Sequence, residues 1–392
     1  MNRLYALPLA AFLGVAAAAP IEVAPAGAYH HLDASGRQSL ALAGGQVALV
    51  WEDSRGGAPR CYLGLKGGAE TAFREYPLGR GECFDPAVAA LDDERFLLAW
   101  EDETGINAAI ASRDGPGTSL NLGAGAHAGI AAQPTLGAQI AWNAPAGRWQ
   151  RLWRASLRVK DGRLHADKAQ PADAAAPADD QTFPALVANE RGFLLAWEDR
   201  RHGHTVIYTS QSGNGRDWSA PLRVSGNPTG KSQNDLGRGT GAMRPAVARF
   251  GNRFAAAWLD KRDFLSGYDV YAALSEGAGF AKDRKAQDSF GDAIAQWHVA
   301  AAGNRRGDLV IAWDDERDGS SDIWLSRLTP GGYSDDFTFP ETSGPARQTD
   351  PAIALDESGN LHLAWIERAA DGESSGPTRL RYMVAPLPGT PR

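Results

Sequence analysis

The side chains in this sequence that are best suited to ligand binding or catalysis lie shortly before seven tryptophans. Each tryptophan closes an apolar run. A short segment starts roughly 12 to 16 residues before it, and the first residue of this segment differs from one unit to the next. These first residues carry carboxylates, guanidiniums, an imidazole, an amide and a phenyl ring, and they are Arg37, Asp85, Gln133, Phe183, Arg244, His298 and Asp350. Gathered in one place, such side chains can orient a polar ligand by charge and stack on its apolar faces.

The elements that would gather them form an internal repeat. The tryptophans are Trp51, Trp100, Trp142, Trp197, Trp258, Trp313 and Trp365, and their successive spacings are 49, 42, 55, 61, 55 and 52 residues. A period near 50 residues is typical of a repeat array. The runs around each tryptophan are short, β-branched or aromatic, and separated by Gly, Pro, Asn and Asp, which predicts strands. Four antiparallel strands per unit, repeated around an axis, are typical of a β-propeller blade.

We therefore expect an all-β, seven-bladed β-propeller with four-stranded antiparallel blades. A six-bladed ring with one degenerate unit is the alternative, because the third unit, with WNAPAG from Trp142, matches the repeat least well. The seventh unit supplies only three strands and ends at RLRYMVAP from Arg379, so an N-terminal strand within Pro20 to Gly27 is predicted to close the ring. In this fold the seven chemically distinct residues would converge on one axial rim, and Trp297 would face the same channel.

The ends of the chain and its two cysteines indicate where the protein works. Residues 1–19 carry an apolar run after Arg3 and small residues at a cleavage site, which predicts a signal peptide and a secreted or periplasmic protein. The propeller is assigned to residues 20–386 and a tail to residues 387–392. In that compartment Cys61 and Cys83 are expected to form a disulfide, with two buried thiols as the alternative. No later segment is long and apolar enough to span a membrane, and a monomer is the default.

Composition and motifs exclude several classes of function. The chain has 40 Lys and Arg against 47 Asp and Glu, a net charge of −7, which argues against a nucleic-acid partner. Gly237, Gly239 and Gly241 lack the βαβ context of a dinucleotide site, so no cofactor is expected. His30 and His31 lack clustered partner ligands, so no metal site is expected. The insertion from Ser225 to Arg244 would join two units on the axial face, either as a lid or as a surface loop.

A second polar pattern follows the tryptophans and recurs in most units. Asp53, Asp199, Asp260 and Asp315 each lie two residues after a tryptophan, and an arginine follows each of them two residues later. A feature that recurs in this way indicates a scaffold rather than a unique site. We expect each aspartate to close a turn onto backbone N–H groups and to pair with its arginine.

One turn carries a family resemblance. The segment Ser212-Gly-Asn214-Gly215-Arg-Asp217-Trp218 resembles the Asp-box of the bacterial neuraminidase repeat, so the chain is similar to the sialidase-like superfamily of propellers. The resemblance implies an arginine cluster for a substrate carboxylate, an Asp acid/base and a Tyr nucleophile paired with a Glu. Arg37 and Arg244 would be candidates for the cluster, and Asp85 or Asp350 for the acid/base. The early Arg-Ile-Pro motif of that family is missing, and the repeat places Tyr382 away from the axis.

These observations lead to two functional hypotheses. The first is a non-catalytic propeller that recognises a glycan or an extracytoplasmic protein through its axial rim. The residues expected to bind are Arg37, Asp85, Phe183, Arg244, Trp297, His298 and Asp350. The alternative is an exo-acting glycoside hydrolase of sialidase type, which would use Arg37, Arg244, Asp85 and Asp350 in catalysis.

Overall fold

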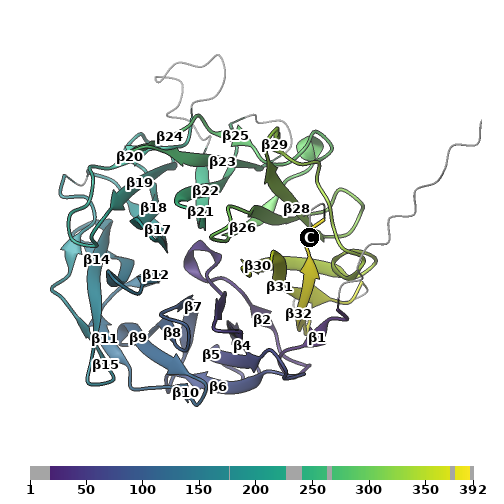
Figure 1. Ribbon diagram of the computed structural model, residues 1–392, viewed down its shortest axis with the longest axis horizontal. Helices are drawn as coiled ribbons and strands as arrows, with labels where there is room; N and C mark the ends of the chain where they lie inside the picture. Colours follow the sequence, from purple (N-terminus) through teal and green to yellow (C-terminus); the bar gives the residue numbers. More distant parts are fainter. Residues whose placement is uncertain (1–17, 176, 227–240, 263–266, 371–375, 389–392) are drawn as a thin grey trace, which may run out of the picture.

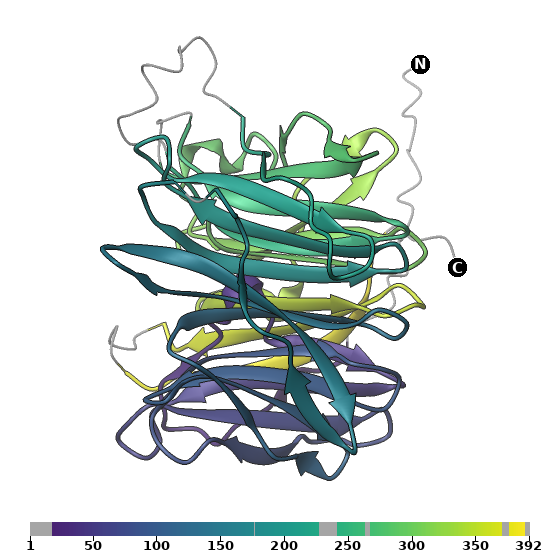
Figure 2. The same cartoon turned by 90° about the vertical axis from the view of Figure 1, so that its left-hand side faces the viewer.

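The chain folds into seven antiparallel sheets arranged in a ring around a central axis (Figure 1). The computed structural model describes residues 18–175, 177–226, 241–262, 267–370 and 376–388. The prediction of an all-β, seven-bladed propeller is therefore confirmed, and the six-bladed alternative is wrong. Figure 2 views the ring from its side, with the teal sheets of the third and fourth blades toward the reader. Most of the predicted signal peptide, residues 227–240 of the insertion and the last four residues of the predicted tail fall outside the described ranges.

The strands follow the sequence repeat, one blade per tryptophan. Blade 1 contains β2 (His30–His31), β3 (Leu40–Ala43), β4 (Gln46–Asp53), β5 (Arg60–Gly67) and β6 (Arg74–Leu78). Blade 2 contains β7 (Cys83–Ala90), β8 (Phe96–Asp102), β9 (Gly105–Ser112), β10 (Gly115–Pro116) and β11 (Leu120–Gly123). Blade 3 contains β12 (Ala126–Gln133), β13 (Gly137–Ala146), β14 (Trp149–Lys160), β15 (Arg163–Ala166) and β16 (Gln170–Pro171). Blade 4 contains β17 (Gln181–Asn189), β18 (Gly192–Asp199), β19 (Val206–Ser212) and β20 (Leu222–Arg223).

The remaining three blades complete the ring. Blade 5 contains β21 (Ala242–Phe250), β22 (Arg253–Asp260), β23 (Asp269–Glu276), β24 (Gly279–Phe280) and β25 (Arg284–Lys285). Blade 6 contains β26 (Trp297–Gly303), β27 (Leu309–Asp315), β28 (Asp322–Thr329) and β29 (Gly332–Tyr333). Blade 7 contains β30 (Arg347–Leu355), β31 (Asn360–Arg368), β32 (Arg379–Pro386) and β1 (Ile21–Glu22). Within the described ranges, no helix has the length and apolar character needed to cross a bilayer.

The ring closes through the N-terminal strand, as predicted. β1 pairs antiparallel with β32, with Ile21 opposite Tyr382 and Glu22 opposite Arg381. The last blade thus combines three strands from the end of the chain with one from its start. This arrangement covers the outer edge of β32, which would otherwise be open to pairing with another chain.

The repeated tryptophans fill the spaces between blades. Five of the seven are fully buried, and Trp100 and Trp142 are 3% exposed. Trp51, for example, belongs to one apolar cluster with Ala352 and Leu380 of the neighbouring blade 7. A single blade has two apolar faces, so each blade depends on both neighbours for its core.

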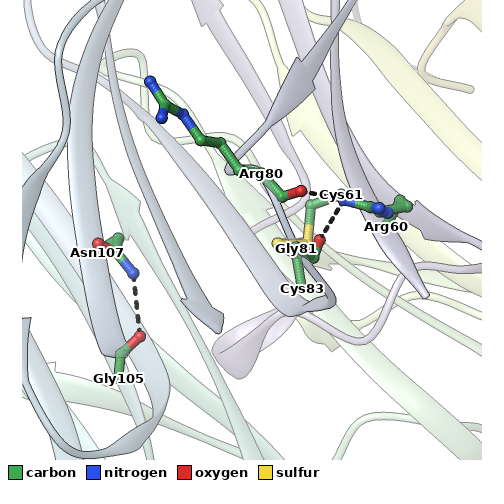
Figure 3. The surroundings of a disulfide bond; sticks show 7 residues. All are labelled: Arg60, Cys61, Arg80, Gly81, Cys83, Gly105 and Asn107. Carbon is green, nitrogen blue, oxygen red and sulfur yellow. Dashed lines mark hydrogen bonds between the residues drawn. A yellow bond between two sulfur atoms is a disulfide. The ribbon is translucent and has the colours of Figure 1, made fainter. Parts of the chain in front are cut away.

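A disulfide links the first two blades. Cys61 on β5 and Cys83 on β7 are bonded, and both are fully buried (Figure 3). Beside the disulfide, the Arg60 guanidinium donates to the carbonyl oxygens of Arg80 and Gly81 at 2.5 and 2.8 Å. The predicted pairing is confirmed, and it fixes the outer part of blade 1 to the start of blade 2.

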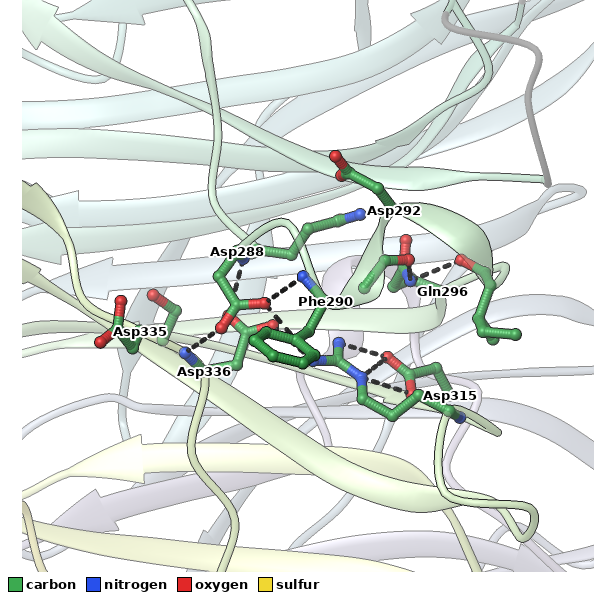
Figure 4. Close-up of polar contacts among 12 residues, drawn as sticks. Asp288, Phe290, Asp292, Gln296, Asp315, Asp335 and Asp336 are labelled. Carbon is green, nitrogen blue, oxygen red and sulfur yellow. Dashed lines mark hydrogen bonds and ion pairs between the residues drawn. The ribbon is translucent and has the colours of Figure 1, made fainter.

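The aspartates after the tryptophans are scaffold elements in four blades. Asp315, labelled in Figure 4, is fully buried. It accepts hydrogen bonds from the Trp313 indole N–H at 3.0 Å and from the Arg317 side chain at 2.6 and 2.9 Å. Arg317 also donates to Asp336 at 2.7 Å. In three other blades the indole N–H of the tryptophan donates in the same way to the aspartate two residues later, namely to Asp53, Asp199 and Asp260. The expected pairing of aspartate with arginine is therefore confirmed, and the two partners belong to the same turn.

The protein's own chain occupies the central axis. The inner strand of blade 1 leaves its sheet after His31 and forms a short 3-10 turn, η1 (Ser35–Arg37), drawn in purple at the centre of Figure 1. The Ser35 hydroxyl donates to the carbonyl oxygen of Pro184 in blade 4 at 2.5 Å. Gly36 has a φ of 65°, and a Cβ there would lie 2.7 Å from the Cβ of Ala185. Any ligand must therefore bind beside this turn rather than in an open channel.

Candidate ligand-binding site on the axial rim

In blades 2 to 7 the innermost strand carries a bulge, and in blade 1 the turn η1 takes its place. One residue at each of these seven positions has left-handed backbone, with φ of 56° at Arg37, 47° at Asp85, 55° at His127, 49° at Phe183, 54° at Arg244, 54° at His298 and 58° at Asp350. In blade 2, Asp85 and Pro86 lie opposite the single residue Trp100. Left-handed backbone costs a non-glycine residue about 1–2 kcal/mol, and its recurrence in every blade indicates that packing enforces it.

Six of the seven residues predicted for this rim occupy these left-handed positions, and the prediction for blade 3 is wrong. The bulged residue there is His127, which precedes Trp142 by 15 residues, whereas Gln133 precedes it by only 9. Gln133 lies at the opposite end of β12 and caps the hairpin turn, where its side chain accepts from the backbone N–H of Thr135 at 2.7 Å. In the other six units the interval is 14 or 15 residues, so the spacing alone could have identified His127.

A carboxylate directly after the tryptophan accepts a hydrogen bond from the backbone N–H of the bulged residue in the next blade. Glu101 accepts the backbone N–H of His127 at 2.9 Å, and Glu198 accepts that of Arg244 at 2.7 Å. Burial raises the pKa of Glu198 to about 7. Burial also raises the pKa of Glu52 to about 8, with nearby carboxylates adding to the effect. These carboxylates were not predicted, because the repeated pairing with arginine involves only the aspartate one position later.

One group of charged residues surrounds η1 on the side of blades 6 and 7. The Arg37 guanidinium donates to Asp350 at 3.0 Å and to the carbonyl oxygen of Leu32 at 2.7 Å. The His298 imidazole lies 2.7 Å from Asp314 through Nδ1 and 3.5 Å from Asp350 through Nε2. Burial opposes ionisation of Asp350, but His298 and Arg37 outweigh it and lower the pKa of that carboxyl. The group is thus internally neutralised.

This group should make stability depend on pH. Burial alone would lower the pKa of His298, but Asp314 and Asp350 outweigh it and raise that pKa. A raised pKa means that protonated His298 stabilises the fold fully below about pH 6.5 and that this contribution disappears as pH rises through the folded pKa. We expect the difference in unfolding free energy between wild type and His298→Gln to shrink above pH 6.5, by up to about 1.4 kcal/mol per pH unit. Urea denaturation at several pH values tests this, and a constant difference would contradict it.

A second group forms a continuous surface across blades 2 to 5. His127 lies 2.6 Å from Asp85 through Nδ1, and its ring centre is 4.2 Å from that of Phe183. The guanidinium of Arg244, an exposed residue, lies 3.7 Å from the centre of the same phenyl ring. Trp297, also predicted for the site, is 42% exposed and instead packs edge to face against Tyr268.

An open cleft of about 540 Å³ lies beside Phe183, between blades 3 and 4. Its walls include His127, Asn143, Gln150, Thr182 and Phe183. Blade 3 forms one wall because its hairpin is long: β13 has 10 residues and β14 has 12. The unit that matches the sequence repeat least well therefore supplies the wall of the cleft.

Asn143 stands where blades 1, 2, 4 and 6 carry a carboxylate. It occupies the position after the tryptophan where Glu101, Glu198 and Asp314 accept the N–H of the next blade. Asn143 is 4% exposed, and within the described part of the chain its Oδ1 atom has no hydrogen-bond partner. Leaving a buried acceptor unpaired costs about 1–3 kcal/mol, so a polar group in the cleft would relieve this penalty.

The turn that resembles an Asp-box has the expected local geometry. Asn214 Oδ1 accepts the backbone N–H groups of Arg216 and Asp217 at 2.9 and 2.8 Å. Gly215 has a φ of 72°, and Trp218 packs near Phe193 with ring centres 6.4 Å apart. The turn is structural, and membership of the sialidase-like superfamily stays a prediction.

Comparisons with known proteins show the fold and no more. No protein-family model matches the chain, and no curated protein matches it. Among solved structures, the chain is similar to the polysaccharide lyase Uly1, with a TM-score of 0.60, 7% identity and 89% of each chain covered. It is similar to a protein of unknown function from Dyadobacter fermentans (TM-score 0.57, 11% identity, 96% of this chain and 100% of that one). It is also similar to an α-L-arabinanase of Penicillium chrysogenum in complex with arabinobiose (TM-score 0.52, 11% identity, 96% and 99% covered).

Proposed function

We propose that this protein is an extracytoplasmic β-propeller that binds a neutral glycan, without cleaving it, in the cleft between blades 3 and 4. The observation that carries the proposal concerns Asn143, which lines the cleft together with Phe183 and whose buried Oδ1 atom has no hydrogen-bond partner among the described residues. A sugar offers both complements, because its hydroxyl groups donate hydrogen bonds and its C–H face stacks on an aromatic ring.

The charge around the cleft favours a neutral sugar over an acidic one. Asn143, Gln150 and Thr182 line the cleft with uncharged polar groups. Asp85 and Glu101 lie next to His127 at one end, so a uronate or sialate placed there would meet like charge as long as no cation occupies this cluster. Close like charges disfavour binding, and the net charge of −7 adds to this effect.

Two further observations support binding rather than sialidase-type cleavage. Arg37 is engaged with Asp350, Asp33 and the carbonyl oxygen of Leu32, so it is not free to grip a substrate carboxylate. Tyr382 lies on β32 in blade 7, is 3% exposed and is hydrogen-bonded to His362 at 2.6 Å, which leaves it remote from the axis. The similarity to an arabinanase and a polysaccharide lyase makes glycans the first ligand class to test. The disulfide and the predicted signal peptide support a location outside the cytoplasm.

Isothermal titration calorimetry with arabino-, xylo- and cello-oligosaccharides tests the proposal. We expect at least one neutral oligosaccharide to bind, and Phe183→Ala or Asn143→Ala to weaken it tenfold or more, because each removes one half of the contact. Phe290→Ala, which alters a phenyl ring that is 83% exposed elsewhere on the surface, is the matched control and should bind like wild type. Equal affinity in all four proteins would exclude this cleft as the site.

An activity assay separates binding from the hydrolase alternative. We expect folded wild-type protein to release no 4-methylumbelliferone from its sialoside or arabinofuranoside. Turnover of either substrate, lost in Asp85→Asn with the fold intact, would replace the binding proposal with an enzyme.

A further inference from the structure

The rim contains two clusters that each combine one imidazole with two carboxylates, although the imidazole lies on the first blade of one pair and on the second blade of the other. Each joins the bulged residues of two successive blades with the carboxylate that follows the first blade's tryptophan. In blades 6 and 7 these are His298, Asp350 and Asp314, and in blades 2 and 3 they are Asp85, His127 and Glu101. Both clusters have one imidazole against a carboxylate, at 2.7 Å in the first and 2.6 Å in the second. In both, the carboxylate after the tryptophan accepts the next bulge's N–H, at 3.1 and 2.9 Å.

The two clusters differ in how their charge is balanced. In the first, the Arg37 guanidinium reaches Asp350 and supplies a fixed positive charge. Among the residues that the structure describes, no arginine or lysine pairs with Asp85 or Glu101. Glu52 adds a third acidic side chain near the cluster, and the Asp85 carboxylate helps to raise its pKa. The second cluster thus has the donors of the first and lacks its cation.

The donor atoms of the second cluster are already close together. One atom from each of Asp85, Glu101 and His127 can be chosen so that all three lie within 4.8 Å of one another, and all three side chains are half-buried. His127 belongs to the cluster and also lines the cleft, and Asn143, which lines the same cleft, has a buried Oδ1 atom with no partner in the described ranges. An acceptor in that position suits a water molecule held by an ion, because bound water becomes a stronger donor.

We propose that Asp85, Glu101 and His127 bind one divalent cation of the zinc or manganese type, in the role that the Arg37 guanidinium has in the related cluster. One imidazole nitrogen with two carboxylate oxygens suits Zn²⁺ or Mn²⁺, whereas Ca²⁺ takes six to eight oxygen ligands. Three protein ligands leave at least one coordination position for water on the side of the cleft. The ligands come from β7, β8 and β12, which explains why no metal motif is visible along the sequence.

Metal titration of untagged protein, after dialysis against a chelator, tests the proposal. We expect calorimetry and elemental analysis to give one Zn²⁺ or Mn²⁺ per chain, and the ion to raise the melting temperature. Asp85→Asn and His127→Gln should each weaken binding tenfold or more and abolish the rise in melting temperature. Asp350→Asn alters the related cluster, and this matched control should still bind one ion.

The outcomes are distinct from those of the glycan experiment. Stoichiometric binding of Zn²⁺ or Mn²⁺ that depends on Asp85 and His127 supports the cation site even where no glycan binds. Binding that is unchanged in both variants, or binding of Ca²⁺ alone, would overturn it. Circular dichroism of each variant without metal confirms that a loss of binding is not a loss of fold.

Discussion

Asp315→Ala should lower the free energy of unfolding by about 3–5 kcal/mol. The Asp315 carboxylate is fully buried and accepts from the Trp313 indole, the Arg317 backbone N–H and two side-chain N–H groups of Arg317. The variant leaves the indole N–H without this acceptor. It also removes one of the two carboxylates closest to Arg317, whose side chain is only 7% exposed. Urea denaturation at pH 7 provides the measurement.

Asp102→Ala is the matched control for this prediction. Asp102 occupies the same repeat position in blade 2, but it is half-exposed and closes a turn onto the backbone N–H and hydroxyl of Thr104 at 2.8 and 2.6 Å. Its removal should cost about 1 kcal/mol, because water can replace the lost hydrogen bonds. Similar losses for both variants would show that burial does not decide the importance of this repeated aspartate.

Removal of the disulfide should lower stability by about 3 kcal/mol. The bond between Cys61 and Cys83 closes a loop with a sequence separation of 22 residues, so its loss increases the conformational entropy of the unfolded chain. The double variant Cys61→Ser, Cys83→Ser should show a lower midpoint in guanidinium chloride than wild type. Wild type with dithiothreitol should shift in the same direction, and the reductant should leave the double variant unchanged. A double variant as stable as oxidised wild type would contradict the prediction.

The number of blades could be predicted because each blade buries one tryptophan, so tryptophans recur at nearly regular intervals in the sequence. Each unit needs one large ring to fill the space against its neighbour, and Trp51, Trp197 and Trp313 are all fully buried. The strand that closes the ring could also be predicted, because the last unit visibly lacked one. Both inferences rest on local pattern and on the need to cover apolar faces and strand edges.

A proline follows four of the correctly predicted rim residues, but the same feature misled the prediction for blade 3. Asp85, Phe183, Arg244 and Asp350 each precede a proline, and all four lie at bulges. In blade 3 the residue after His127 is alanine, and Pro134 lies in the hairpin turn instead, so the proline pattern selected Gln133. The distance to the tryptophan is the better guide, because it is fixed by the length of the paired strands.

The composition of the clusters depended on tertiary structure. Asp85 and His127 are 42 residues apart and Arg37 and Asp350 are 313 apart, yet each pair is in direct contact. The sequence alone determined which blades exist, which residue types they present at the axis and that one disulfide could form. Only the folded ring decided that η1 fills the axis and that Arg37 neutralises one cluster and not the other. It also decided that the Oδ1 atom of Asn143 has no partner among the described residues. These outcomes depend on which blades become neighbours in the ring. The local sequence pattern does not give the distances between residues of different blades.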